Sequence, residues 1–154
     1  MTSDLSGIIK EKTHFFQIRV FYEDTDFTGI VYHANYLKFA ERGRTNFLRL
    51  LDINHSDLIS TNEPKYFVVY KMNSKFLGTS TIDDILEVRS IFKSIEGVRL
   101  KIDQDIFKDE KKLFSANIEF ALLDKNAKPL KFPDDMKLKI KKYTILFVGS
   151  VRCV

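Results

Sequence analysis

The segment YLKFAERGRTNFLRLL, residues 36–51, decides the fold of this chain. Its apolar residues recur at spacings of four, three, four and four, with charged residues between them; they are Tyr36, Ala40, Gly43, Phe47 and Leu51. This spacing predicts an amphipathic helix of about five turns. A glycine on the apolar face costs about 1 kcal/mol relative to alanine, so we expect Gly43 to allow close approach to a sheet.

Five segments on either side of this helix have the composition or the alternation of β-strands. One precedes the helix, at residues 14–21, and four follow it, at residues 66–76, 85–95, 98–103 and 112–123. Short connections between the later segments predict antiparallel neighbours. The expected fold is therefore α+β, with an antiparallel sheet of about five strands and one long helix. One helix covers only part of such a sheet, so we also expect a homo-oligomer.

Length and charge place the chain among ordinary globular domains. With 154 residues, 44% apolar and 30% charged, it is expected to form one domain over residues 1–135, followed by a tail over residues 136–154. The net charge of +4 comes from that tail, because residues 1–135 carry 20 basic and 21 acidic side chains. A basic tail on a neutral body argues against nucleic acid as a partner.

The tail combines four lysines with the apolar run at residues 143–148. This run is too short to span a bilayer, and it fits an added edge strand, a frayed end or a weak peripheral membrane contact. The single cysteine, Cys153, predicts neither a disulfide framework nor a cysteine-based metal site. With no signal-peptide pattern at the N-terminus, we expect a cytoplasmic protein.

An acidic loop, EDTDFTGIVYHANY at residues 23–36, leads directly into the helix. A carboxylate placed there lies beside the free N–H groups and the positive end of the helix dipole, which suits a developing oxyanion. Asp26 is the candidate base or nucleophile, and Gly29 lets the backbone turn tightly or approach a ligand. A purely structural alternative is an Asx-type turn formed by Asp24 and Thr25. Acyl transfer is the chemistry that this arrangement suits.

Other polar residues of this loop have structural and functional interpretations. Asn35 is expected to cap the helix, because it stands just before the periodic segment. His33 lies in the same loop as Asp26 and is a candidate for substrate contact. For His14 and His55, which lie in a strand and a polar loop, a structural or solvated role is expected.

The string FYEDTDFTGIVYHANYLKFAERGRTNFL, residues 21–48, resembles the hotdog-fold acyl-CoA thioesterases of the 4-hydroxybenzoyl-CoA thioesterase family, and most closely their YbgC-like members. A second similar stretch is FVVYKMNSKFLGTSTIDDILEV, residues 67–88. The resemblance implies a hotdog fold, in which the sheet wraps around the long helix, and thioester hydrolysis without cofactor or metal. It also implies active sites at a dimer interface.

The resemblance assigns roles to four loop residues. It implies that Asp26 is the catalytic aspartate and that a backbone N–H near His33 polarises the thioester carbonyl. The His33 side chain is implied to lie at the active site, and Gly29 and Tyr32 lie on the matched substrate-binding loop. Phe27 and Thr28 depart from the small residues that are common in the subfamily, which leaves the chain-length preference open. An acyl-CoA substrate and a homodimer or homotetramer follow, with acyl-carrier protein as a further contact.

Three other functions are compatible with parts of the sequence. A hotdog hydratase or dehydratase would pair a histidine with an acid, for which His33 and Glu41 are available. A non-catalytic acyl-CoA or acyl-carrier-protein binding scaffold would bind without turnover. A Mg²⁺ site built from Glu23, Asp24 and Asp26 would need near-octahedral geometry from one strand end.

Overall fold

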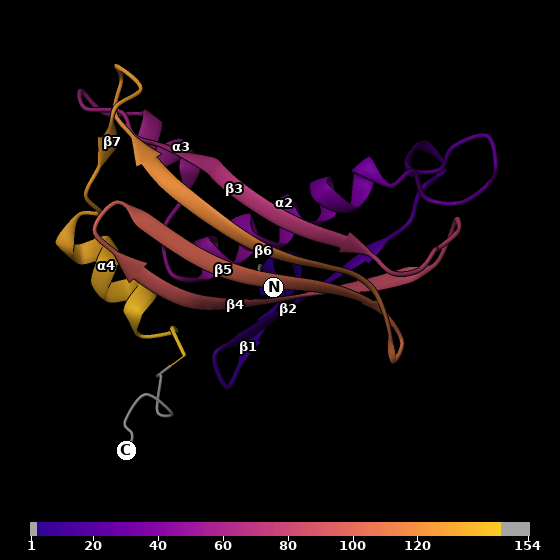
Figure 1. Ribbon diagram of the computed structural model, residues 1–154. Coiled ribbons are helices and arrows are strands. Elements are labelled where there is room, and N and C mark those ends of the chain that lie inside the picture. Colours follow the sequence, from indigo (N-terminus) through magenta and orange to yellow (C-terminus); the bar gives the residue numbers. More distant parts are fainter. Residues whose placement is uncertain (1–2, 146–154) are drawn as a thin grey trace.

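A single antiparallel sheet organises the chain, and helix α2 (Ala34–Leu50) lies along one of its faces (Figure 1). The computed structural model describes residues 3–145. The sheet has seven strands in the order β1-β2-β4-β5-β6-β3, and β7 pairs with β6. The strands are β1 (Ile8–Lys10), β2 (Thr13–Arg19), β3 (Tyr66–Phe76), β4 (Ile85–Glu96), β5 (Arg99–Lys108), β6 (Lys111–Leu123) and β7 (Pro129–Leu130). The expected α+β fold and long helix are confirmed.

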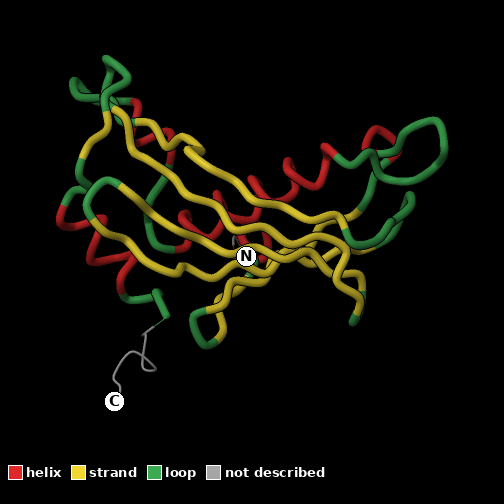
Figure 2. Tube along the Cα trace, in the orientation of Figure 1, coloured by secondary structure: helices red, strands yellow, loops and turns green. Residues whose placement is uncertain are grey.

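Four short helical segments complete the chain (Figure 2). They are α1 (Ser3–Ser6), the 3-10 helix η1 (Tyr22–Asp24), α3 (His55–Ile59) and α4 (Asp134–Lys141). The sheet has two strands more than the five expected, β1 and β7. These strands contain three and two residues, so neither is long enough to show an alternating pattern.

Helix α2 packs closely on the sheet at Gly43, as expected. A Cβ atom added to Gly43 would lie 2.6 Å from Cγ1 of Val88 on β4. Carbon atoms in normal contact are about 3.5–4.0 Å apart, so no larger residue fits without movement of the helix or of Val88. The apolar face of α2 is buried, with Phe39, Ala40 and Phe47 at 0% exposure.

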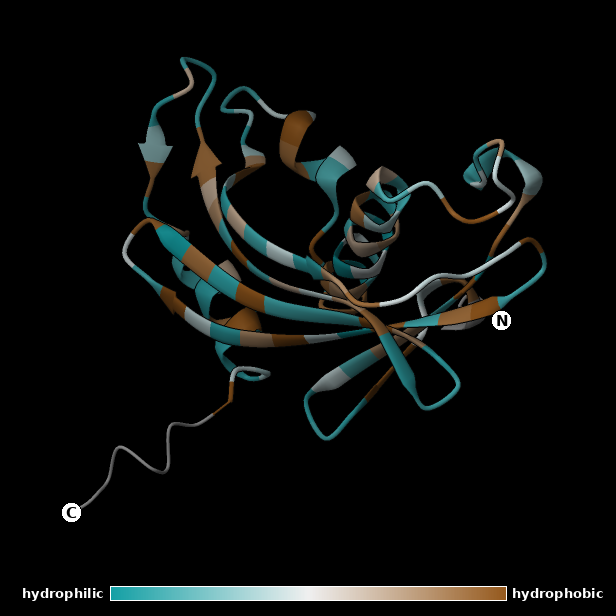
Figure 3. Ribbon diagram, turned by 45° about the vertical axis from the view of Figure 1, so that its right-hand side comes forward, coloured by the Kyte–Doolittle hydropathy of each residue, from teal (hydrophilic) through white to brown (hydrophobic). Residues whose placement is uncertain are grey.

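Alternation along the central strands supplies the other half of the core. In β4 and β5 every second side chain is buried over most of the strand, and Figure 3 shows apolar and polar residues following one another along them. The buried side chains face α2, and the intervening ones face outward. His14 on β2 is also fully buried: its Nε2 lies 2.6 Å from the Ser6 carbonyl oxygen, and its ring stacks on Phe47 at 4.9 Å. Its role in the described fold is structural.

The expectation that consecutive strands are neighbours is only partly correct. The pairs β4–β5 and β5–β6 are antiparallel neighbours, but β3 pairs with β6 and β4 pairs with β2. The segment between β3 and β4, residues 77–84, therefore runs from the β3 edge of the sheet past β6 and β5 to reach β4. There it contacts the acidic loop: the Val31 N–H donates to the Ser80 carbonyl at 2.8 Å, and Ile30 bridges Thr81. Because residues 77–84 are held against the acidic loop, their short length does not make β3 and β4 antiparallel neighbours.

The segment expected as a tail begins as a helix. α4 spans the expected boundary at residue 135, and its Met136 and Ile140 are buried against the body of the protein. After it, Thr144 forms a parallel bridge with Phe92 of β4. Residues 146–154, which include the second half of the apolar run and Cys153, lie outside the described residues. The division into residues 1–135 and 136–154 stays a prediction.

Among the helices of residues 3–145, none has the length and apolar character needed to cross a bilayer.

Candidate active site

The acidic loop connects β2 to α2 and is held by its own polar groups. The Asp24 carboxylate accepts a hydrogen bond from the Phe21 N–H at 2.8 Å, which caps η1. The Asp24 carbonyl accepts from the Tyr32 N–H at 3.0 Å and from Asn35 Nδ2 at 2.8 Å. Asp24 is therefore a structural residue that ties the loop to the start of α2.

Asn35 does not cap the helix as expected. The N-cap residue is His33, no side chain caps this end, and Asn35 lies in the first turn. Its side-chain amide instead reaches back to the Asp24 carbonyl, because the loop folds over the helix start and offers a nearby acceptor. The amides of His33 and Ala34 have no hydrogen-bond acceptor within residues 3–145. Two donors at the positive end of a long helix thus stay free for a ligand.

Asp26 lies at the turn of the loop with its carboxylate exposed to solvent. The Thr28 N–H donates to Asp26 Oδ1 at 2.8 Å, and the Thr28 hydroxyl donates to the same oxygen. These hydrogen bonds, the hydroxyl's first, hold the pKa of the Asp26 carboxyl below its usual range, against a small opposing effect of desolvation. Asp26 is therefore ionised at neutral pH, and Oδ2 has no partner within the described residues. A free, ionised carboxylate oxygen can act as a base or a nucleophile.

Gly29 closes the turn around Asp26. The Gly29 N–H donates to the Asp26 carbonyl at 2.9 Å, and the Asp26 N–H donates to the Ile30 carbonyl at 2.9 Å. The φ of Gly29 is +89°, a conformation that residues with a Cβ rarely adopt. Gly29 is thus needed for the backbone path, and the space beyond its Cα is open.

Apolar side chains around this loop are unusually exposed. A shallow depression is lined by Tyr22, Thr25, Asp26, Phe27, Gly29 and Ile82. Phe27 is fully exposed, and Tyr22 is 83% exposed. Large apolar side chains in one exposed cluster mark a surface that binds a ligand or another chain. Asp26 and Gly29 both line this depression.

Tyr32 and His33 lie at the helix start, next to the end of β3. The His33 ring is exposed and stands edge-on to Phe76 at 5.5 Å, with Tyr32 at 4.7 Å on another side. Phe76 and Ser80 were not singled out in the sequence, although both lie in the second resembling stretch. Ser80 anchors the helix start through a 2.7 Å hydrogen bond between its Oγ and the Tyr36 hydroxyl.

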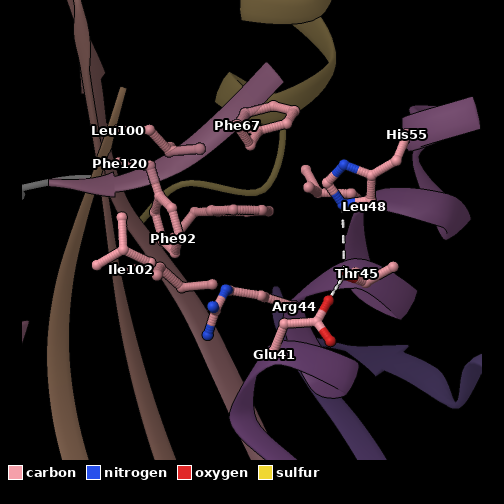
Figure 4. A pocket seen from close by; sticks show the side chains of 11 residues that line it. Glu41, Arg44, Thr45, Leu48, His55, Phe67, Phe92, Leu100, Ile102 and Phe120 are labelled. Atoms are coloured by element: carbon pink, nitrogen blue, oxygen red, sulfur yellow. Dashed lines mark hydrogen bonds between the residues drawn. The ribbon is translucent and has the colours of Figure 1, made fainter. Parts of the chain in front are cut away.

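A second cavity lies at the opposite end of α2, between this helix, α3 and the sheet (Figure 4). Its volume is about 110 Å³, and its walls are mainly apolar, with Leu48, Phe67 and Phe120 among them. Its polar residues are Glu41, Arg44, Thr45 and His55. Glu41 is eight positions after His33 on one helix, or about 12 Å along its axis. One chain therefore does not bring together the histidine and acid of the hydratase interpretation.

Arg44 is the residue of this cavity that sequence analysis missed. Burial lowers its pKa to about 10, although Glu41 opposes this effect. The sequence signal was its place on α2 beside the apolar positions 40, 43, 47 and 48. A long arginine stem in such a position can lie along apolar surface, and the sequence did not reveal where the charged end points.

No group of three or more metal-binding side chains occurs in the described part of the chain. Asp24 and Asp26 direct their carboxylates to different backbone N–H groups, of Phe21 and Thr28. The expectation of a metal-free reaction stays a prediction.

The fold and the site together define the hotdog class, in which an antiparallel sheet wraps one long helix and a carboxylate loop leads into it. Solved structures agree. A probable thioesterase from Bartonella henselae superposes with a TM-score of 0.76 at 40% identity, over 79% of this chain and 99% of that one. A 1,4-dihydroxy-2-naphthoyl-CoA thioesterase from Synechocystis has a TM-score of 0.77 over 84% of this chain and 96% of its own, and at 19% identity it shows likeness of fold alone.

Sequence comparison gives the family. Residues 28–115 match the profile of the thioesterase superfamily. The acyl-CoA thioesterase YbgC of Haemophilus influenzae is 34% identical over 123 residues, which cover 79% of this chain and 90% of that protein. The chain belongs to the thioesterase superfamily, as the resemblance implied, and is a hydrolase by class.

Proposed function

We propose that the protein hydrolyses the thioester bond of acyl-CoA to a free acid and a thiol, with Asp26 as base or nucleophile. The observation that carries the proposal is an ionised carboxylate oxygen without a partner, on a loop that leads into a helix start with two unpaired amides. The relatives named above act on acyl-CoA thioesters, or are described as thioesterases, by their own names.

The chemistry requires charge stabilisation more than activation of the substrate. As water or a carboxylate adds to the carbonyl carbon, negative charge develops on the carbonyl oxygen. The unpaired amides of His33 and Ala34 are the candidate donors to that oxygen, and one such donor is worth roughly 3–4 kcal/mol. Asp26 either adds to the carbonyl to give a mixed anhydride, which water then hydrolyses, or removes a proton from the attacking water. The thiolate of CoA leaves in both routes and takes up a proton.

The other loop residues have supporting roles in this proposal. The His33 imidazole lies at the helix start and contacts the bound substrate. Tyr32 packs beside His33 and covers one side of the acyl group. Gly29 keeps the turn open, because a side chain there would occupy the space in which substrate approaches Asp26. Acyl-carrier protein in place of CoA would present the same thioester.

We further propose that the protein works as a homodimer or homotetramer. Strand β3 is at the end of the sheet order, so one of its edges is unpaired in the described chain. It is 11 residues long, and Tyr66, Val69, Tyr70 and Phe76 on it are all more than 40% exposed. A long, apolar free edge is a template for pairing with another strand. Antiparallel pairing of two β3 edges would bury these side chains.

The location that we propose is the cytoplasm, because its reducing conditions suit a chain with one cysteine.

The test is thiol release from short, long and aromatic acyl-CoAs in the presence of EDTA. Asp26→Asn is expected to lower kcat/KM by about 100-fold or more, because the amide is neither a base nor a nucleophile. Glu23→Gln is the matched control: it makes the same charge change three positions away and is expected to keep activity. Circular dichroism of each variant reports the fold. Absence of thiol release by the natural protein from every thioester, or equal activity of Asp26→Asn, would overturn the proposal.

A further inference from the structure

The Arg44 cavity, defined by Glu41, Arg44, Thr45, Leu48, His55 and Phe67 together with apolar residues of β4, β5 and β6, has no part in the chemistry described so far. Its volume of about 110 Å³ corresponds to about four water molecules at their volume in the liquid. Figure 4 shows the Arg44 side chain running from α2 toward the sheet, beside Phe92 and Ile102. Such a cavity accepts a short apolar chain and offers it one charged group.

The Arg44 guanidinium is poorly compensated. It has five N–H donors, and the described residues give it one hydrogen bond, a long one of 3.4 Å to Gln104 Oε1. No carboxylate oxygen of the described chain lies within 4.0 Å of its nitrogens; the four ion pairs found there involve other residues. The guanidinium carbon also lies over the face of the Phe120 ring, 5.0 Å from its centre. Arg44 is half-buried and has no counter-charge among the described residues, and a carboxylate is the ligand that fits its planar fork.

Glu41 is the one acid among the residues that line the cavity. Glu41 is exposed to solvent, and its Oε2 accepts a 2.6 Å hydrogen bond from the Thr45 hydroxyl. Water therefore screens the Glu41 charge more than that of Arg44. Burial lowers the pKa of His55 most; Glu41 raises it, and Arg49 and Arg44 lower it further. Of the arginine and the acid that line the cavity, Arg44 is half-buried and Glu41 is exposed.

In a dimer joined through β3, the Arg44 cavity of one protomer lies near the acidic loop of the other. Phe67 lines the cavity, whereas Phe76 contacts His33 at the other end of the strand, nine residues or about 30 Å away. An acyl group of a few carbon atoms cannot reach both sites in one chain. In an antiparallel pair of β3 edges, the Phe76 end of one strand lies beside the Phe67 end of the other. The thioester held by one protomer then points its acyl group at the Arg44 cavity of its partner.

From this geometry we infer that Arg44 is a specificity-determining residue, and that the preferred substrate is a thioester of a short dicarboxylic acid whose free carboxylate binds its guanidinium. The inference rests on the proposed function and its homodimer. The apolar walls hold the methylene groups, and Arg44 binds the terminal carboxylate in a bidentate manner. Monocarboxylic acyl groups of equal length leave the guanidinium unpaired and are poorer substrates.

The experiment measures kcat/KM for glutaryl-CoA and adipyl-CoA against butyryl-CoA and hexanoyl-CoA, with the rate without protein subtracted. The natural protein is expected to prefer the dicarboxylic members. Arg44→Met keeps an unbranched side chain without charge, and is expected to lower their kcat/KM by about 10- to 100-fold while changing the monocarboxylic values by less than about threefold. Arg42→Met, on the exposed side of the same helix, is the matched control and is expected to change neither class.

A second variant separates specificity from a loss of folding. Arg44→Lys keeps the charge without the fork and is expected to give an intermediate preference, with the thermal transition of both variants measured alongside. Equal rates for the two substrate classes in the natural protein, or an equal loss for both in Arg44→Met, would overturn the inference and leave the thioesterase proposal intact. Release of thiol from none of the four thioesters would instead overturn the thioesterase proposal and this inference with it.

Discussion

The replacement of Gly43 by alanine tests how closely α2 packs on the sheet. The added Cβ would lie 2.6 Å from Val88 Cγ1 and 3.2 Å from Val88 Cβ. Normal carbon contacts are about 3.5–4.0 Å, so the overlap is about 1 Å at the nearer atom. Val88 is completely buried and branched at Cβ, so it has few ways to move aside.

Two effects of opposite sign decide the free energy of unfolding. Alanine stabilises a helix interior by about 1 kcal/mol relative to glycine. Overpacking of a core costs about 1–3 kcal/mol. We expect the overlap to win, with a net loss of about 1 kcal/mol, which lowers Tm by about 2–4 °C in a chain of this size.

A double-mutant cycle with Val88→Ala gives the sharper result. Val88→Ala alone removes two carbon atoms from the core and is expected to cost about 1–2 kcal/mol. It also makes room for the new Cβ, so Gly43→Ala should be harmless or stabilising in that background. The expected coupling between the two sites is about 1 kcal/mol or more.

Urea denaturation followed by circular dichroism measures all four proteins of the cycle. Additivity of the two changes within about 0.5 kcal/mol would refute the reasoning, because sites in contact must couple. A rise in Tm on Gly43→Ala alone would refute it equally, since the helix would then have had space for a side chain.

Two further predictions concern pH. Thr28→Val removes the hydroxyl that does most to lower the pKa of Asp26, so that pKa should rise. The acidic limb of the profile of kcat/KM against pH should then move to higher pH. An acidic limb that stays where it is in the natural protein would show that Asp26 does not cause it. Burial lowers the pKa of His14, with the Ser6 carbonyl partly opposing it. The unfolded chain therefore takes up a proton more readily than the folded one, and stability that is complete above about pH 6.5 is lost as pH falls through the lower pKa of the folded state. Tm should thus fall between about pH 7.5 and 5, and His14→Phe, which keeps an aromatic ring beside Phe47, should fall less; equal slopes for both proteins would contradict this assignment.

Local patterns in the sequence determined the elements of the fold. The spacing of apolar residues predicted α2, and composition or alternation predicted β3, β4 and β6 to within one residue, because such patterns reflect burial on one face of a helix or strand. The segment predicted at residues 98–103 ends five residues before β5 does. Gly43 was correctly interpreted, since a glycine on an apolar helix face has few reasons to be there other than close contact. The acidic loop was likewise recognisable, because its residues are contiguous.

The tertiary structure alone decided which elements meet. Short connections made β3 and β4 look like neighbours, yet β3 pairs with β6, and residues 77–84 instead support the loop through Ser80. Asn35 was assigned as a cap because its type and position fit one. Its actual partner, the Asp24 carbonyl, depends on how the loop folds back over the helix.

The Arg44 cavity shows the same limit most clearly. The sequence determined that α2 would present both apolar and basic side chains, since periodicity along one helix is a local property. Whether the end of an arginine reaches water or lies against Phe120, 76 positions later, depends on contacts between segments that are far apart in the chain. Such contacts arise from the packing of complete elements, and no short stretch of residues encodes them.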